Sequence, residues 1–535
     1  MVEEFVKFID EYEKYVAEKS KELHTKYFEA TISGNPDDYQ KVSELEYELS
    51  QYYSDKEKYE FLLKVKESGE ITEHVLNREL TLLINSFASH QFDEKLMKQI
   101  IDISTDLEHK FSTYRATIGN KEYTDNEIDE ILETSRDSKE LEAAWKASKK
   151  IGKEISDEVI NVVKLRNKAA RQLGYDNYHE MSLKLSEQTP EEILQLLDEL
   201  DSMTASGFSE IKSEMDEKLS SYYNVPVNEL KPWHYQDKFF QQGPKIVDLD
   251  LDSFYADKNI VELTRKYYNG IGLEIDDLLE KSDLFEKPGK YQHAYCTDID
   301  REGDVRVLCN IKPNYKWMGT MLHEFGHAVY DKFIERKLPW ELRTHAHIFT
   351  TEAIAMMFGR MAASPKWMHD VAGIETSKIE SIKEDAEKLL RTEQIVFSRW
   401  VQVIYRFESA MYDNPEQDLN SLWWNLVEKY QLLKKPDRRD EPDWASKIHV
   451  ALYPAYYHNY ILGEILASQL YYFISTKVLD NNFPEDVSFA GKKEVGEYLK
   501  NLFFSYGAVY PWNELIEKST GEKLTPKYYA MQFVK

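Results

Sequence analysis

Cysteine is scarce in this chain of 535 residues, and long apolar runs are missing. Only Cys296 and Cys309 are present, which excludes a fold held together by several disulfides and favours a reducing compartment. No apolar stretch is long enough to cross a bilayer, and the chain begins with acidic residues instead of the basic start of a signal peptide. We therefore expect a cytoplasmic protein with two free thiols.

Positive charge is also in short supply. The 68 Lys and Arg residues are outnumbered by 96 Asp and Glu residues, which gives a formal net charge of −28. Because so acidic a surface repels nucleic acid and anionic membranes, we expect neither as a partner. Short peptides that are basic or neutral would be attracted to it.

Glycine and proline are too few, at 20 and 16, to divide the chain into many short elements. Residues 5–26, 38–53 and 191–219 instead have apolar residues three and four positions apart, which is typical of amphipathic helices. We predict a mainly α fold, with a two-lobed helical body around a deep central cleft. Residues 1–230 would form an N-terminal helical half, either a lid or ordinary scaffold, and 231–535 the catalytic half of one continuous body.

One region has strand character instead. Residues 290–297 and 305–311 are rich in β-forming side chains, and the turn-forming residues 300–304 lie between them. This pattern predicts a small antiparallel hairpin that contains His293.

The most informative motif follows directly, as His323-Glu324-Phe325-Gly326-His327. In a helix, His323 and His327 lie on one face, one turn apart, and can bind one metal ion. Glu324 would lie beside the open coordination position and accept a proton from a zinc-bound water, whose pKa zinc lowers toward ~7. Because two histidines on a partly buried helix would give the same pattern, a third ligand is needed to distinguish the two interpretations.

Glu352 is the predicted third ligand of a single zinc ion. It lies in the apolar stretch 350–358, for which Thr350 is the expected N-cap, and Ser364-Pro365 should end the helix. A Glu in such a stretch is costly to bury unless it binds a metal or is paired.

Other third ligands are less favoured. A metzincin would need a histidine at position 333, which is Phe333 here. His345 and His347 remain open as ligands, as substrate contacts or as exposed loop residues.

Together these motifs resemble those of angiotensin-converting enzyme and its oligopeptidase relatives, thimet oligopeptidase and oligoendopeptidase F. The likeness covers most of the chain from about residue 110 and is carried by the zinc motif with Glu352-Ala-Ile, by His293-Ala294, by Lys447-Ile448-His449 and by the tyrosine-rich run 453–460. The resemblance implies a zinc peptidase of the gluzincin type that acts on short peptides. It also implies that His293 and Ala294 lie on a strand that lines the substrate cleft.

Further roles follow from the same resemblance. His449 and Tyr460 are expected to stabilise the oxyanion, and Tyr457 to contact the substrate. A register without a gap would point to Tyr456 and Asn459 instead, and Asn459 has the wrong chemistry for the role. Lys447 matches the lysine that binds the substrate's C-terminal carboxylate, although a solvated surface lysine is an equally good interpretation.

Two positions depart from the converting-enzyme pattern. Met356 replaces an Asp that orients a zinc-binding histidine, so some other group must do so. Asn459 replaces an Arg of a chloride site, which argues against chloride activation. The favoured function is an oligopeptidase that cuts inside short peptides. The alternatives are a peptidyl-dipeptidase acting from free C-termini and a non-catalytic peptide-binding protein.

Overall fold

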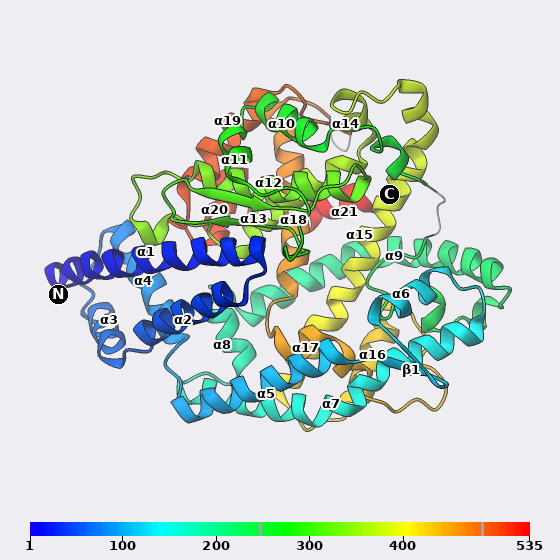
Figure 1. The fold of residues 1–535 in the computed structure, drawn as a ribbon, viewed down its shortest axis with the longest axis horizontal. Coiled ribbons are helices and arrows are strands. Elements are labelled where there is room, and N and C mark those ends of the chain that lie inside the picture. Colours follow the sequence, from blue (N-terminus) through cyan, green and yellow to red (C-terminus); the bar gives the residue numbers. More distant parts are fainter. Residues whose placement is uncertain (246–248, 483–485, 535) are drawn as a thin grey trace. The chain divides into compact units, whose positions relative to one another are not determined.

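The computed structural model describes residues 1–245, 249–482 and 486–534. It is 69% helical, and its described residues form two small two-stranded antiparallel sheets (Figure 1). The predicted mainly α fold class is confirmed.

The chain folds into two compact units, each assembled from three stretches of sequence. Unit 1 contains Met1–Gln91, Leu249–Ala386 and Leu462–Tyr528, and unit 2 contains Phe92–Asp248, Glu387–Ile461 and Tyr529–Lys535. Each unit therefore draws on both halves of the chain. The division near residue 230, the lid and the central cleft stay predictions.

Four helices begin unit 1: α1 (Val2–Ser33), α2 (Pro36–Tyr53), α3 (Lys56–Ser68) and α4 (His74–Ala88). The predicted helices over 5–26 and 38–53 are confirmed and are longer at one or both ends. Helix α2 begins where the Asn35 side chain accepts a hydrogen bond from the Asp37 amide, with Pro36 as its first residue. Their apolar faces meet in a core that includes Phe5, Tyr12, Leu62, Leu83 and Phe87.

The predicted hairpin is present in unit 1 as β3 (Tyr295–Asp298) and β4 (Val305–Leu308), with Tyr295 opposite Leu308. Its strands are shorter than the sequence pattern. Both cysteines are free thiols, as predicted. His293 is exposed, and both His293 and Ala294 lie before the first residue of β3, so neither is part of the strand on which the resemblance placed them.

Helices α12 (Tyr315–Phe333) and α13 (Ile348–Gly359) follow the hairpin and pack against each other. The predicted N-cap of α13 is wrong, because the cap is His347, whose side chain accepts from the Phe349 amide, and Thr350 lies one turn inside. A Cβ atom at Gly326 would lie 2.7 Å from the Cα of Ala355. Glycine at this position therefore lets the two helices approach closely.

Unit 2 is built around the long helices α5 (Glu94–Thr113), α7 (Ser138–Gln172) and α9 (Pro190–Tyr223), and it also contains the shorter α16 (Leu419–Gln431) and α17 (Ile448–Leu452). The helix predicted over 191–219 is confirmed as α9.

The strands and α-helices of the two units that have not yet been named are β1 (Ala116–Ile118), β2 (Lys121–Tyr123), α6 (Asp125–Thr134), α8 (Tyr178–Leu185), α10 (Ile260–Gly270), α11 (Asp276–Lys281), α14 (Pro365–Asp370), α15 (Thr376–Asp413), α18 (His458–Phe473), α19 (Lys493–Leu502), α20 (Trp512–Thr520) and α21 (Lys527–Phe533).

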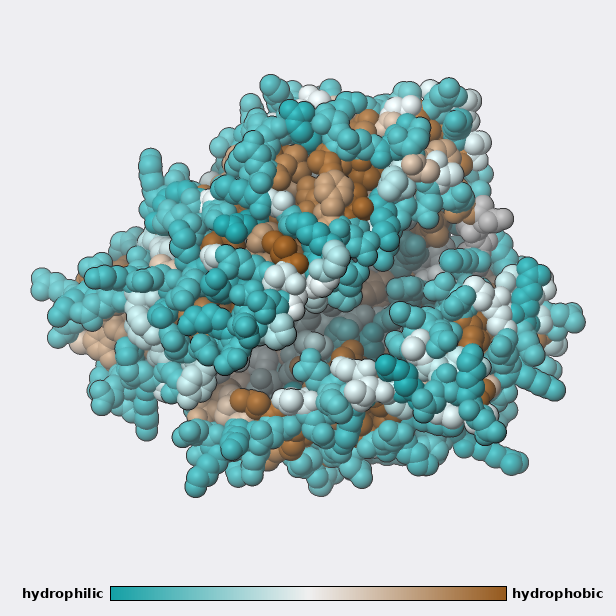
Figure 2. Space-filling model, viewed as in Figure 1, coloured by the Kyte–Doolittle hydropathy of each residue, from teal (hydrophilic) through white to brown (hydrophobic). Residues whose placement is uncertain are grey.

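Hydrophilic residues predominate on the face drawn in Figure 2, and the hydrophobic residues there form small patches bordered by hydrophilic ones. This distribution agrees with the net charge of −28. Within the described ranges, every helix is too short or too polar to span a membrane.

Candidate active site

The two helices α12 and α13 bring three potential metal ligands together in unit 1. The Nε2 atoms of His323 and His327 are 3.2 Å apart, and a carboxylate oxygen of Glu352 lies 3.6 Å from the first and 3.9 Å from the second. Zinc bonds of about 2.0–2.2 Å in a tetrahedron require ligand atoms roughly 3.3–3.6 Å apart. Across the part of the chain that the structure describes, this trio is the one group of three such side chains close enough to hold a metal ion.

The electrostatics of the trio suit a divalent cation. Burial lowers the pKa of His323 to about 4 and lowers the pKa of His327 well below its ordinary value. Both imidazoles are therefore neutral near pH 7, which is the form that binds metal. Burial raises the pKa of Glu352 to about 7, and a cation beside it would stabilise its carboxylate. Two neutral imidazoles and one carboxylate are a donor set that fits zinc.

Thr351, which the sequence analysis did not identify, orients one of the two histidines. Its hydroxyl oxygen lies 2.7 Å from Nδ1 of His327. With a metal ion bound at Nε2 of His327, Nδ1 would carry the proton and donate a hydrogen bond to this oxygen. Met356, where the converting-enzyme pattern has an Asp, lies close to Gly463. The hydroxyl of Thr351, the residue before Glu352, thus makes a contact to one of the two histidines, where the resemblance has a carboxylate at position 356.

A cavity of about 290 Å³ surrounds the trio within unit 1. It is lined by Ala294, Tyr295, Cys296, His323, Glu324, His327, Asp331, His345, Ile348, Thr351 and Glu352. Burial raises the pKa of Glu324 to about 8, and the nearby Glu352 adds to the effect. Glu324 is thus a carboxyl group poised to exchange a proton near neutral pH, as general acid–base catalysis requires.

The cavity lining also bears on the weaker predictions. Ala294 belongs to it, whereas His293 is not among the lining residues. His345 lines it too, with its Nδ1 3.9 Å from a carboxylate oxygen of Asp331, but it is not part of the metal-binding trio.

The other predicted groups belong to unit 2, where they lie close to one another. The rings of His449 and Tyr457 meet edge to face with centroids 4.9 Å apart, and those of Tyr457 and Tyr460 do so at 5.3 Å. Burial lowers the pKa of His449 to about 4, and the nearby Lys447 contributes to the effect. His449 is therefore neutral at physiological pH and can donate one N–H to an acceptor.

Lys447 is a buried residue, so its interpretation as a solvated surface lysine is wrong. Only 8% of it is exposed, and its Nζ lies 5.3–5.4 Å from the ring centroids of Phe239, Trp400 and Tyr457. The Nζ donates to Oε1 of Gln241 at 2.6 Å, and the Tyr457 hydroxyl lies 3.5 Å from the same oxygen. Gln241 was not identified from the sequence, because it lies 206 positions before Lys447.

The alternative register for the catalytic tyrosine gains no support. Asn459 is buried, and its side-chain oxygen accepts a hydrogen bond from the amide of Gln188 at 3.1 Å. The same Gln188 also contacts Nε2 of His458 at 2.7 Å. Asn459 thus belongs to a buried network within unit 2, whereas Tyr457 lies against Lys447. The role of Tyr460 stays a prediction.

Comparison with known proteins extends these observations. The family model described as angiotensin-converting enzyme matches residues 2–533. The chain belongs to the angiotensin-converting enzyme family. An angiotensin-converting enzyme of Theromyzon tessulatum is 24% identical over 494 residues, covering 85% of this chain and 79% of the relative.

Other relatives are similarly distant in sequence. The angiotensin-converting enzyme of Haematobia irritans exigua is 24% identical over 458 residues, which cover 76% of this chain and 72% of the relative. Thermostable carboxypeptidase 1 of Pyrococcus furiosus is 24% identical over 269 residues, which cover 44% of this chain and 51% of the relative. Membership makes the chain a metallopeptidase and makes zinc its expected metal. The likeness to thimet oligopeptidase and oligoendopeptidase F stays a prediction.

Proposed function

We propose that this protein is a zinc peptidyl-dipeptidase that removes dipeptides from the free C-termini of short, unstructured peptides. The observation that supports this activity best is the environment of Lys447. Among the described residues this buried lysine makes no ion pair, and its hydrogen-bond partner is the neutral Gln241. Because a buried ammonium is costly unless a negative charge compensates it, the C-terminal carboxylate of a substrate is a suitable partner.

The proposed chemistry divides among a few side chains. His323, His327 and Glu352 would hold one zinc ion, which supplies a Lewis acid and lowers the pKa of a water molecule. Glu324 takes a proton from the attacking water and later delivers it to the leaving amine. His449 and Tyr460, for which the resemblance implies this role, would each donate a hydrogen bond to the developing oxyanion, which can stabilise a transition state by several kcal/mol. Lys447 with Gln241 and Tyr457 binds the carboxylate that sets the point of cleavage.

Two rival functions give different results in one experiment. An oligopeptidase that cuts inside peptides would not need a free C-terminus, and a non-catalytic peptide-binding protein would not cut at all. A ten-residue peptide and its C-terminally amidated twin are incubated with the purified protein, and the products are identified by mass spectrometry. We expect successive loss of dipeptides from the free-acid peptide, little cutting of the amide, and no cutting when a chelator is present.

Lys447→Met tests the carboxylate assignment directly. We expect this variant to lose at least about tenfold in kcat/KM on the free-acid peptide and to lose its preference for that peptide over the amide. Lys150→Met is the matched control, because it removes the charge of an exposed lysine in the same unit. Internal cuts in both peptides, unchanged in Lys447→Met, would overturn the proposed activity in favour of an oligopeptidase.

A further inference from the structure

Residues 237–242, which include Gln241, form a segment that is neither helix nor strand and is partly buried, with Phe240 fully buried. Its backbone is strained, because Phe240 has a φ of 52°, which is rare for a residue other than glycine. Such a conformation persists only where surrounding contacts enforce it. The contacts around this segment therefore decide where the next residue, Gln241, places its side chain.

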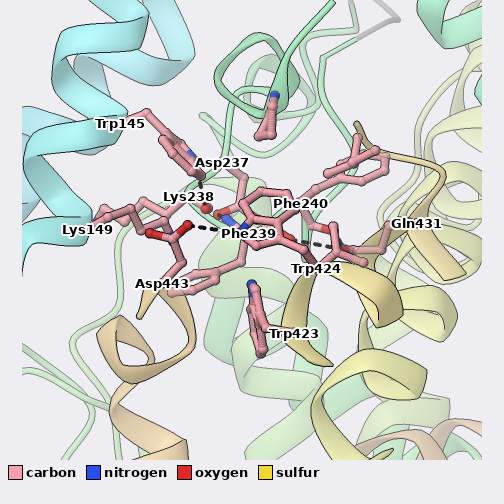
Figure 3. Close-up of a pocket in the computed structure, with 13 residues that line it drawn as sticks. Trp145, Lys149, Asp237, Lys238, Phe239, Phe240, Trp423, Trp424, Gln431 and Asp443 are labelled. Atoms are coloured by element: carbon pink, nitrogen blue, oxygen red, sulfur yellow. Dashed lines mark hydrogen bonds between the residues drawn. The ribbon is translucent and has the colours of Figure 1, made fainter. Parts of the chain in front are cut away.

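Side chains from two helices hold the backbone carbonyls of the segment (Figure 3). Nε1 of Trp145, on α7, donates to the carbonyl of Lys238 at 3.0 Å. The amide of Gln431, at the end of α16, donates to the carbonyls of Phe239 at 3.0 Å and of Phe240 at 2.8 Å. Gln431 is 1% exposed, so both bonds form away from water.

The first residue of the segment also forms hydrogen bonds with its last two residues. The carboxylate of Asp237 accepts hydrogen bonds from the backbone amides of Gln241 at 2.5 Å and of Gln242 at 3.2 Å. Gln431 thus fixes the two carbonyls that precede Gln241, while Asp237 fixes the amide of Gln241 itself. The backbone of Gln241 has little freedom to move.

Phe239 links this segment to the buried lysines of unit 2. Its ring lies 3.2 Å from Nζ of Lys149 and 5.3 Å from Nζ of Lys447, as centroid distances. Figure 3 shows the ring of Phe239 near the centre of this group, between residues of α7 and of α16. The bonds of Gln431 therefore hold the carbonyl of Phe239, whose ring contacts Lys447, and the carbonyl of Phe240. The Phe240 carbonyl belongs to the peptide bond that joins Phe240 to Gln241, the hydrogen-bond partner of Lys447.

We infer that Gln431 is a positioning residue for the carboxylate-binding group, and that it sets the preference for peptides with a free C-terminus. This inference rests on the proposed function. Gln431 touches no substrate; it holds the strained Phe239–Phe240 backbone so that Oε1 of Gln241 meets Nζ of Lys447. Without its two hydrogen bonds the strained backbone would relax, and the side chain of Gln241 would lose its place.

The test compares kcat and KM for the free-acid peptide and its amidated twin. Gln431→Leu removes both hydrogen bonds, and Gln431→Met also removes them while keeping an unbranched side chain of similar length, which serves if the first variant does not fold. For either variant we expect KM of the free-acid peptide to rise about tenfold or more, with kinetics on the amide unchanged. Gln417→Leu is the matched control, because Gln417 in the same unit also donates to two backbone carbonyls, those of Ala410 and Asn414.

Lys447→Met separates failure of this inference from failure of the proposed function. If Lys447→Met abolishes the preference for the free acid while both Gln431 variants keep it, the positioning role is wrong and the carboxylate assignment stands. If Lys447→Met leaves the preference unchanged, the carboxylate assignment itself is wrong, and the inference fails with it. If the Gln431 variants lost kcat/KM equally on the free-acid peptide and on the amidated peptide, Gln431 would have a structural role only, and the inference would also be overturned.

Discussion

At the scale of single residues, the trio proposed to bind the metal has one hydroxyl, that of Thr351, against one of its histidines. Thr351 accepts a hydrogen bond from Nδ1 of His327 and so fixes the direction in which Nε2 points. Thr351→Val keeps the shape of this buried side chain but removes the acceptor. Because contacts of this kind contribute about 10–100-fold to metal affinity, we expect the zinc Kd to rise at least tenfold, as measured by competition with a chromophoric chelator.

Thr350→Val is the control for this prediction. The hydroxyl of Thr350 donates to the carbonyl of His347 at 2.7 Å, so this variant removes a hydrogen bond that does not involve a metal ligand. An equal rise in zinc Kd for both variants would mean that α13 as a whole had loosened, and the specific role of Thr351 would then be wrong.

Residues within one helical turn of each other were the predictable part of the site. His323, Glu324 and His327 could be assigned because a helix fixes their relation, and Glu352 because an acid in an apolar helix is costly to bury. Thr351 was missed because a threonine beside a ligand carries no signal of its own. The one hint was the methionine at 356, which showed that some other partner was needed but not which one.

At the scale of elements, the buried Glu79 and Glu341 and the half-buried Glu13 lie where α1, α4 and the short helix Trp340–Leu342 meet in unit 1. Glu79 is 3% exposed, and its Oε1 has no hydrogen-bond partner within the described residues. Burial, and then the nearby Glu13 and Glu341, raise its pKa to about 8. Nη1 of Arg301 lies 3.6 Å from Oε2 of Glu341, and the guanidinium offsets part of the negative charge of this cluster.

This cluster should make unit 1 less stable as pH rises. A carboxyl whose pKa is higher in the folded state than in the unfolded state, where it is about 4.3, binds its proton more tightly when folded. Its contribution to stability is complete below the unfolded pKa and is lost progressively up to about pH 8. We therefore measure thermal unfolding of the wild type and of Glu79→Gln from pH 5 to pH 8. The Tm of the variant minus the Tm of the wild type should increase as the pH rises.

Glu67→Gln controls for the loss of one acidic side chain, because Glu67 is an exposed residue of α3. Its Tm difference from the wild type should stay nearly constant over the same range. If the difference for Glu79→Gln were equally constant, Glu79 would be ionised in the folded protein throughout, contrary to the shift given above.

At the scale of the whole molecule, the class of fold was predictable and its division was not. Apolar residues three and four apart predicted helices such as α1, α2 and α9, because each helix must bury one face. Which helices share a core depends on side chains far apart in sequence. The carbonyls that Gln431 holds lie about 190 residues before it, and the two units are each assembled from three separate stretches. No local pattern in the sequence records such pairings.

The net charge of −28 is a property of the whole chain, and it predicts how the rate should depend on salt. An acidic surface raises the local concentration of cationic peptides, and salt screens this attraction because the Debye length falls from about 30 Å at 0.01 M to about 3 Å at 1 M. For a peptide rich in Lys and Arg, we expect kcat/KM to fall several-fold between low and high ionic strength.

Three peptides with the same last two residues provide the comparison for this prediction. Each presents the same C-terminal carboxylate, so any effect of salt on its capture by Lys447 is common to all three and cancels in their ratios. Relative to a neutral peptide, the basic peptide should lose rate with salt and the acidic peptide should gain it, because attraction and repulsion are screened alike. If the three peptides responded equally, the local field at the catalytic group would differ from the charge of the whole molecule, and peptide charge would not govern substrate choice.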